Sequence, residues 1–212
     1  MTDALDRSPG LPAADLHERI REAAFALLLT ERRAIAPDEI AAATGGPRSG
    51  LRRILDQLAR AGWIDRDEQG RVTGSAGLSL TTGPHRIAID GTEFRTWCAY
   101  DSIGIAAALK TDAAIRTECA VCGTEIALDT RAGRPPVDRP ERLWLASGGT
   151  DLRGDFCDPT VLMCSPEHAA VWAERQSGHG RTVDLPEAAR LGEEGWQSCA
   201  AAVGLLPYRQ KA

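Results

Sequence analysis

Apolar side chains near the start of the chain recur at helical spacing. They do so between Ile20 and Leu29, which predicts a first helix. Pro37 begins a second one, because proline suits the first helical turn and the acids after it suit the positive end of the helix dipole; this helix should end near Gly45. A third helix is predicted over roughly Arg48 to Ala61. Its apolar side chains share one face: Leu51, Ile54, Leu55 and Leu58.

A short β-ribbon follows these helices. Trp63–Asp65 and Arg71–Thr73 have the composition of strands and flank a turn-rich segment, Asp67–Gly70. Three helices and a ribbon indicate a winged-helix-like unit, which we assign to residues 15–82. Residues 1–14 are rich in proline, glycine and aspartate and are expected to form a mobile arm.

The rest of the chain, residues 83–212, predicts a second unit of α+β class, a mixed or antiparallel β core with flanking helices. The series of expected strands begins within the first unit, at 78–81. It continues with 85–90, 115–118, 125–129, 143–146, 160–164 and 181–185. The expected helices are 95–109, 166–176 and 187–202. Ser165-Pro166 is a typical helix start, with serine as the cap.

Composition and charge restrict the class of protein. A chain of 212 residues with 43% hydrophobic and 26% charged residues is typical of a globular protein of one or two domains. The longest apolar runs, Ala23–Leu29 and Ile103–Leu109, are far shorter than the ~18 residues of a membrane span. The N-terminus lacks the pattern of a signal peptide, so we expect a cytoplasmic protein without membrane contact.

The net charge of −5 argues against a polyanion as the main partner. The third predicted helix does carry a local excess of arginine, as DNA-reading helices do. However, residues 1–70 hold 10 arginines against 12 acidic residues, so we do not expect nucleic acid to be bound.

Six cysteines are the sharper signal. In the cytoplasm thiols stay reduced, so metal binding or catalysis is favoured over a disulfide framework. Cys98 and Asp101 are three residues apart and would share one face of the predicted helix 95–109. A buried free cysteine usually acts as a small apolar side chain, but a carboxylate in a helix of alanine and isoleucine is costly to bury without a function.

The other cysteines leave alternatives open. Cys119-Ala-Val-Cys122-Gly has the form of a zinc knuckle, yet Cys157 and Cys164 are spaced too widely for the second half of a zinc ribbon. The first pair is therefore expected to form a turn between strands, and the Cys157 loop could present its thiol to a cleft. Three other residues are expected to have no catalytic or metal-binding role. Cys199 should pack in the core. His168 and His179 lack ligand spacing to any cysteine and should lie on the surface or in loops.

The stretch Thr96-Trp-Cys-Ala-Tyr-Asp101 resembles the active-site helix of the alkylmercury (organomercurial) lyases, the MerB family. Phe156-Cys157 resembles the second catalytic cysteine of that family, and Cys119 matches a further family cysteine thought to be structural. The similarity extends over most of the chain after the arm. It departs from the family where Asp158 replaces a second adjacent cysteine of some members, and Cys122 and Cys164 are additions.

The resemblance implies a lyase that cleaves R–Hg⁺ to R–H and Hg²⁺. Cys98 and Cys157 would be the mercury ligands, because thiolates suit a soft metal, and Asp101 would carry the proton and is a further candidate ligand of the metal. No organic cofactor would be needed, and Hg²⁺ would pass to cellular thiols or to a mercuric reductase. Two alternatives stay open: a thiol-based metal-binding protein or metal-responsive winged-helix regulator, and a structural zinc protein that uses Cys119 and Cys122.

Overall fold

The computed structural model describes residues 14–46 and 49–205. The predicted arm, residues 1–14, lies outside the described residues except for Ala14, and so does Arg48, where the third helix is expected to begin. Among the described residues, no helix combines the length and the apolar character that crossing a membrane requires.

The N-terminal helices and the ribbon are confirmed. Their bounds are α1 Ala14–Glu31, α2 Pro37–Thr44, α3 Leu51–Arg60, β1 Ile64–Arg66 and β2 Val72–Ser75. Helix α2 has Pro37 in its first turn and ends where Gly45 adopts φ +64°, a left-handed conformation that suits glycine. Helix α3 buries the predicted leucines Leu51, Leu55 and Leu58.

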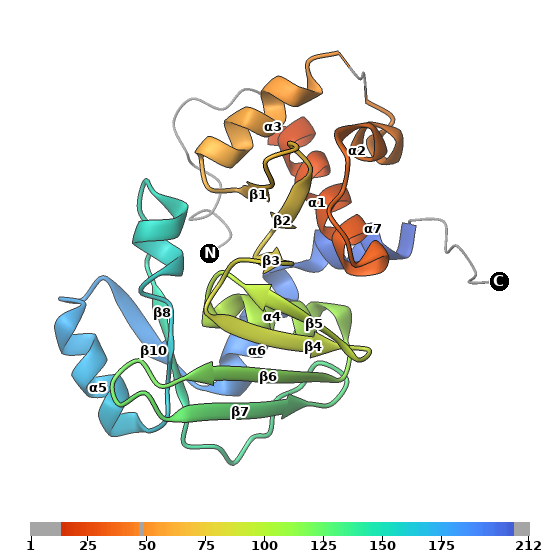
Figure 1. The fold of residues 1–212 in the computed structure, drawn as a ribbon. Coiled ribbons are helices and arrows are strands. Elements are labelled where there is room, and N and C mark those ends of the chain that lie inside the picture. Colours follow the sequence, from red (N-terminus) through yellow and green to blue (C-terminus); the bar gives the residue numbers. More distant parts are fainter. Residues whose placement is uncertain (1–13, 47–48, 206–212) are drawn as a thin grey trace.

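One antiparallel sheet of seven strands joins both predicted units (Figure 1). Its further strands are β3 Leu78–Ser79, β4 His85–Ile89, β5 Thr92–Thr96, β6 Ala113–Glu118 and β7 Glu125–Thr130. The strand order is β1-β2-β3-β5-β4-β6-β7. Because β3 pairs with β5, the hydrogen-bonded ladder continues across residue 82.

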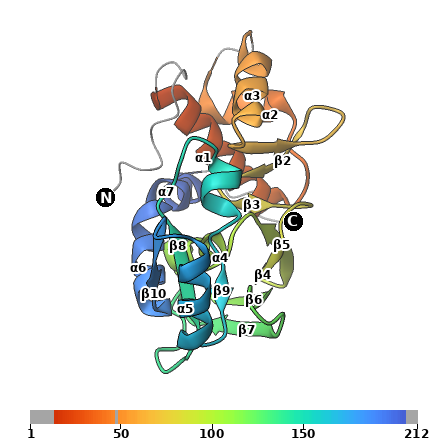
Figure 2. The ribbon, with the colours of Figure 1, turned by 90° about the vertical axis from the view of Figure 1, so that its left-hand side faces the viewer.

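A smaller antiparallel sheet has the order β10-β8-β9. Its strands and the remaining helices are β8 Arg142–Ala146, β9 Leu162–Met163, β10 Gly180–Val183, α4 Ala99–Leu109, α5 Pro166–Arg175, α6 Leu185–Gly195 and α7 Gln197–Leu205. Helix α4 packs on the large sheet, and the smaller sheet contacts the large one through β9 (Figures 1 and 2). Helix α5 covers the small sheet, α6 packs on α4, and α7 packs on α1. Helix α4 is almost wholly buried and crosses α6 where Gly104 meets Gly192; a Cβ on Gly192 would lie 2.2 Å from the Cα of Gly104. Glycine at both positions therefore lets the two backbones touch.

Three predicted elements need correction. Helix 95–109 begins only at Ala99, since Thr92–Thr96 alternates buried and more exposed side chains and pairs as β5. The strand expected at 160–164 shrinks to Leu162–Met163. The single helix expected at 187–202 is two helices, which meet at Trp196, where the backbone leaves helical geometry (φ −109°, ψ 14°). The indole N–H of Trp196 donates a buried hydrogen bond of 2.7 Å to the carbonyl of Ala76.

Candidate active site

Cys98 lies immediately before helix α4, not within it. It is the N-cap residue, with extended backbone (φ −137°, ψ 170°), and its carbonyl accepts a hydrogen bond of 3.1 Å from the hydroxyl of Thr96. The expectation that Cys98 and Asp101 share a helix face is therefore wrong in detail. Residues 92–97 are strand and connection, so the cysteine meets the carboxylate across the helix start.

Asp101 is held by that same helix start. It is the third residue of α4, and its carboxylate accepts a hydrogen bond of 2.8 Å from the backbone N–H of Cys98. This is the half of a capping box in which an acidic side chain satisfies the N-cap donor. Gly77 lies directly against the carboxyl group, since a Cβ there would be 2.5 Å from the Asp101 Cγ. The N–H of Cys98 and the backbone of Gly77 thus restrict where the carboxylate can lie.

Cys157 closes the π-helical turn η1, Leu152–Cys157, in the loop between β8 and β9. The Asp155 carboxylate stabilises the start of this turn by accepting the N–H groups of Thr150 and Asp151 at 2.8 and 2.9 Å. Thr160 then ties the turn to helix α4: its N–H donates to the carbonyl of Cys157, and its carbonyl accepts the N–H of Ala99. This link brings the second cysteine to the first.

The structure brings all three predicted site residues together. One ligand atom each of Cys98, Asp101 and Cys157 lies within 4.8 Å of the others. The three side chains are buried, at 0%, 4% and 4% exposure. Two sulfurs from distant parts of the chain and a carboxyl group can therefore contact a single ion or bond.

A cavity of about 90 Å³ leads to this cluster. Asp101 and Cys157 line it, whereas Cys98 does not and lies deeper. Its other walls come from both predicted units and include four aromatic side chains, Trp63, Trp97, Phe156 and Trp196, together with Glu18 and Arg21 of helix α1. A larger hollow of about 830 Å³, between α1, α2 and α7, contains none of the three site residues.

Burial sets the protonation of the cluster. It raises the pKa of Asp101 to about 6, although hydrogen bonds from Cys98 and the positive charge of Arg153 oppose this rise. Burial also raises the pKa of the Cys98 thiol, and the neighbouring Cys157 and Asp101 add to the effect. Near neutral pH Cys98 therefore keeps its proton beside a carboxyl group able to take one.

Arg153 is a site residue that the sequence analysis missed. Its guanidinium stacks over the Trp97 ring at 3.3 Å from the centroid, and it donates to the carboxylate of Asp65 at 2.8 Å and the carbonyl of Gly62 at 2.7 Å. Arg153 thereby links the β-ribbon to the turn η1, which contains Cys157. The sequence holds no signal for this, because Asp65 on the ribbon and Gly62 just before it are 88 and 91 residues away from Arg153.

A second cluster also departs from expectation. Cys119, Cys122, Cys164 and His168 place their ligand atoms within 4.8 Å of one another. The expectation that His168 is a plain surface or loop residue is therefore wrong, while His179 is exposed as expected. Burial opposes ionisation of Cys119, but backbone N–H donors, foremost that of Cys164, together with His168 lower its pKa to about 6. Cys199 is buried, as predicted, and lines the first cavity.

Comparison with known proteins places most of the chain in one family. The family model for alkylmercury lyase, MerB, matches residues 78–197. An alkylmercury lyase from Bacillus cereus is 27% identical over 169 residues, which cover 78% of this chain and 75% of that protein. A solved structure, the mercury-bound form of MerB2, has a TM-score of 0.72 at 21% identity and covers 89% of this chain and 100% of its own. That structure supports the likeness of fold.

The N-terminal unit has a different similarity. The IclR helix-turn-helix domain model matches residues 23–68. The transcriptional repressor MprA from Escherichia coli strain K12 is 32% identical over 80 residues, which cover 38% of this chain and 46% of the repressor. The winged-helix-like prediction for the N-terminal unit is thus supported by its fold and by its relatives.

Proposed function

Because the chain belongs to the alkylmercury lyase family, we propose that it is an organomercurial lyase that cleaves the carbon–mercury bond of R–Hg⁺. The products are the hydrocarbon R–H and Hg²⁺, a reaction that serves mercury resistance. The observation that carries the proposal is the convergence of Cys98, Cys157 and Asp101 at one buried cavity. Thiolates supply the soft ligands that mercury prefers, and the carboxyl group supplies a proton path.

Cys157 captures the substrate. The organomercurial enters as R–Hg bound to a small carrier thiol, and of the two proposed mercury ligands Cys157 is the one that lines the cavity. Its sulfur displaces the carrier, so that a Cys157–mercury bond forms, the carrier–mercury bond breaks, and the proton of Cys157 leaves on the carrier thiol. The aromatic walls hold the organic group.

Cys98 and Asp101 complete the cleavage. Asp101 takes the proton of the Cys98 thiol, and the resulting thiolate binds mercury as its second sulfur ligand. Electron density on the metal rises and weakens the carbon–mercury bond. Asp101 then delivers the proton to carbon, the electron pair of the broken bond becomes the new C–H bond, and the carboxylate is restored. A pKa of about 6 suits both transfers near neutral pH.

Release of Hg²⁺ needs other thiols. After cleavage the ion is held by two cysteines, and exchange onto a cellular thiol or a mercuric reductase frees the site. We propose that the reaction needs no organic cofactor, since the three side chains account for every proton and bond. The proposal places the protein in the cytoplasm, where thiols are kept reduced.

Methane detected above a solution of methylmercury, protein and excess thiol tests the proposal. Cys98→Ser and Cys157→Ser should each abolish methane release, because a hydroxyl is a poor ligand for mercury. Serine is also a good N-cap, so Cys98→Ser should leave helix α4 intact. Asp129→Asn, an exposed carboxylate on β7, is the control and should keep full activity. Full activity in both serine variants would contradict the proposed roles.

A metal-responsive regulator is the second candidate, favoured by the helix-turn-helix matches. The same N-terminal unit contributes Glu18, Arg21 and Trp63 to the wall of the cavity that leads to the proposed mercury ligands. A gel-shift with DNA from upstream of the gene, with and without Hg²⁺, distinguishes the candidates. Retarded DNA without methane release would favour the regulator, and methane release without retarded DNA favours the lyase.

A further inference from the structure

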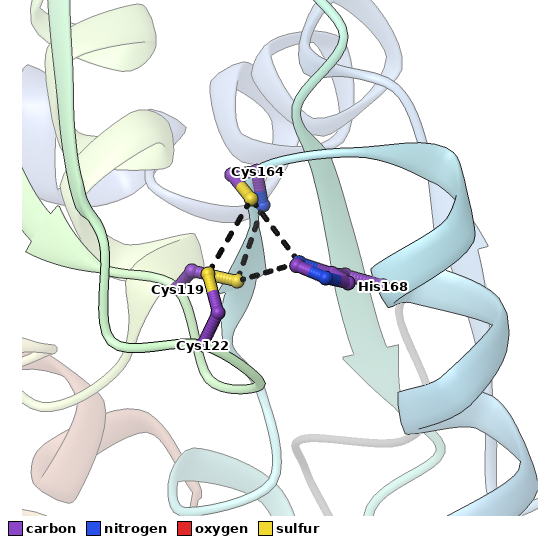
Figure 3. Close-up of side chains that lie close together, drawn as sticks. All are labelled: Cys119, Cys122, Cys164 and His168. Atoms are coloured by element: carbon purple, nitrogen blue, oxygen red, sulfur yellow. Dashed lines mark hydrogen bonds between the residues drawn. The ribbon is translucent and has the colours of Figure 1, made fainter.

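We propose that Cys119, Cys122, Cys164 and His168 bind a structural Zn²⁺ that joins the β6–β7 turn to the start of helix α5 (Figure 3). The site shares no residue with the catalytic cluster. Three cysteines and one histidine form one of the common closed ligand sets of structural zinc.

The first half of the site is a tight turn. The N–H of Cys119 donates to the carbonyl of Thr124 at 2.8 Å, and the N–H of Gly123 donates back to the carbonyl of Cys119 at 2.9 Å. Gly123 has φ +72°, which glycine adopts without steric cost. The turn directs the sulfurs of Cys119 and Cys122 toward the same space (Figure 3).

The second half is the junction of β9 and α5. Cys164 directly precedes the N-cap Ser165, whose hydroxyl accepts the N–H of His168 at 3.3 Å. The first turn of the helix thus turns the imidazole back toward Cys164. A hydrogen bond of 3.1 Å from the N–H of Ala120 to the carbonyl of Leu162 aligns the two halves through their backbones. The fold therefore brings the ligands together independently of any ion.

The separations match a tetrahedral zinc site. Zn–S bonds of about 2.3 Å and a Zn–N bond of about 2.0 Å at tetrahedral angles imply S···S and S···N separations of about 3.8 and about 3.5 Å. The sulfurs of Cys122 and Cys164 are 3.8 Å apart. The Nδ1 atom of His168 is 3.5 Å from the sulfur of Cys119 and 3.2 Å from that of Cys164.

The surroundings also favour bound thiolates. The backbone N–H of Cys164 points at the sulfur of Cys119 at 3.4 Å, and such donors stabilise negative charge on sulfur. Three thiols and an imidazole this close have few other partners, whereas a divalent cation satisfies all four. With four protein ligands no position is left for a substrate, so the role is structural.

The location gives the ion a consequence for the first site. Only six residues, 158–163, separate Cys157 from Cys164 along the chain. Zinc would fix the end of this segment and so limit the movement of the Cys157 turn. Loss of zinc should therefore weaken lyase activity indirectly, without removing any group that touches mercury.

The test is the metal content of protein purified without added metal and then desalted. We expect about one Zn²⁺ per wild-type chain and less than about a tenth in Cys164→Ser and His168→Ala. His179→Ala is the matched control for the histidine. Cys157→Ser, which lacks a proposed mercury ligand, should also retain its zinc. A failure of the lyase proposal can thus be distinguished from a failure of the zinc proposal.

Cobalt provides a second readout on folded protein. Co²⁺ added to the metal-free chain should give the thiolate charge-transfer and tetrahedral ligand-field absorption of a sulfur-rich site, and Zn²⁺ should abolish it. Among the three cysteine ligands, Cys122 is the exposed one, so the Cys122→Ser variant should stay folded and suits this measurement. Zinc-free wild-type protein without a cobalt spectrum, or His168→Ala with wild-type zinc content, would overturn the proposal.

Discussion

Gly77→Ala should damage catalysis far more than stability. Gly77 has φ +89°, a conformation that costs an L-residue about 1–2 kcal/mol. For a chain of this size that cost corresponds to a fall in Tm of roughly 2–8 °C. The new Cβ would also lie 2.5 Å from the Cγ of Asp101, against at least 3.4 Å for ordinary contact.

The carboxyl group of Asp101 must therefore move by about 0.9 Å. A displacement of about 1 Å at a reacting group costs on the order of 100-fold in rate, so kcat for methane release should fall about 100-fold. Mercury binding should change little, because both sulfurs stay in place. Gly77 is a positioning residue in this account, since it acts through Asp101.

Gly91→Ala is the matched control. Gly91 has φ +73° in the β4–β5 turn, and an added Cβ there meets no atom within 4 Å. Both variants should lose similar stability by calorimetry, but only Gly77→Ala should lose methane release. Equal kcat in the two variants would refute the argument that contact with Gly77 holds the catalytic carboxylate.

Three further outcomes follow from the site. The kcat should rise with pH through about 6, because Asp101 must be ionised to accept the Cys98 proton; a flat profile between about pH 5 and about pH 7 would contradict this. Arg153→Gln should move that rise to higher pH, since Arg153 lowers the pKa of Asp101, while the exposed control Arg131→Gln should leave it unchanged; equal profiles would contradict the charge effect. Methylmercury should be cleaved faster than phenylmercury, because the cavity of about 90 Å³ is smaller than the roughly 150 Å³ that holds benzene; a faster phenyl reaction would show that the walls open.

Short-range sequence patterns predicted those features of the fold that neighbouring residues determine. The starts of α2 and α5 follow from Pro37 and from the Ser165-Pro166 pair, which act within one helical turn. Cys98, Asp101 and Cys157 were predicted as site residues because they and their neighbouring residues resemble the motifs of a known family. Their convergence, which spacing alone leaves open, depends on Thr160 bridging the Cys157 turn and helix α4.

Long-range pairing accounts for what the sequence could not show. Residues 92–96 form a strand because β3 and β4 lie on either side of β5, although the adjacent alanine-rich run favours helix. Arg153 acquires its role from a ribbon far away in the chain. His168 joins Cys119 only because β9 lies beside β6, and its spacing of four residues from Cys164 is the one signal that could have indicated a ligand pair.

The central claim is that Asp101 carries the proton to carbon while two cysteines hold mercury. Methylmercury in D₂O with excess thiol, with headspace mass spectrometry, tests it most directly in wild-type and Asp101→Asn protein. The amide oxygen of asparagine can still accept the Cys98 N–H, so the helix start should persist. We predict that the wild type releases monodeuterated methane, and that Asp101→Asn binds mercury but releases no methane. Methane release by Asp101→Asn at the wild-type rate would contradict the account.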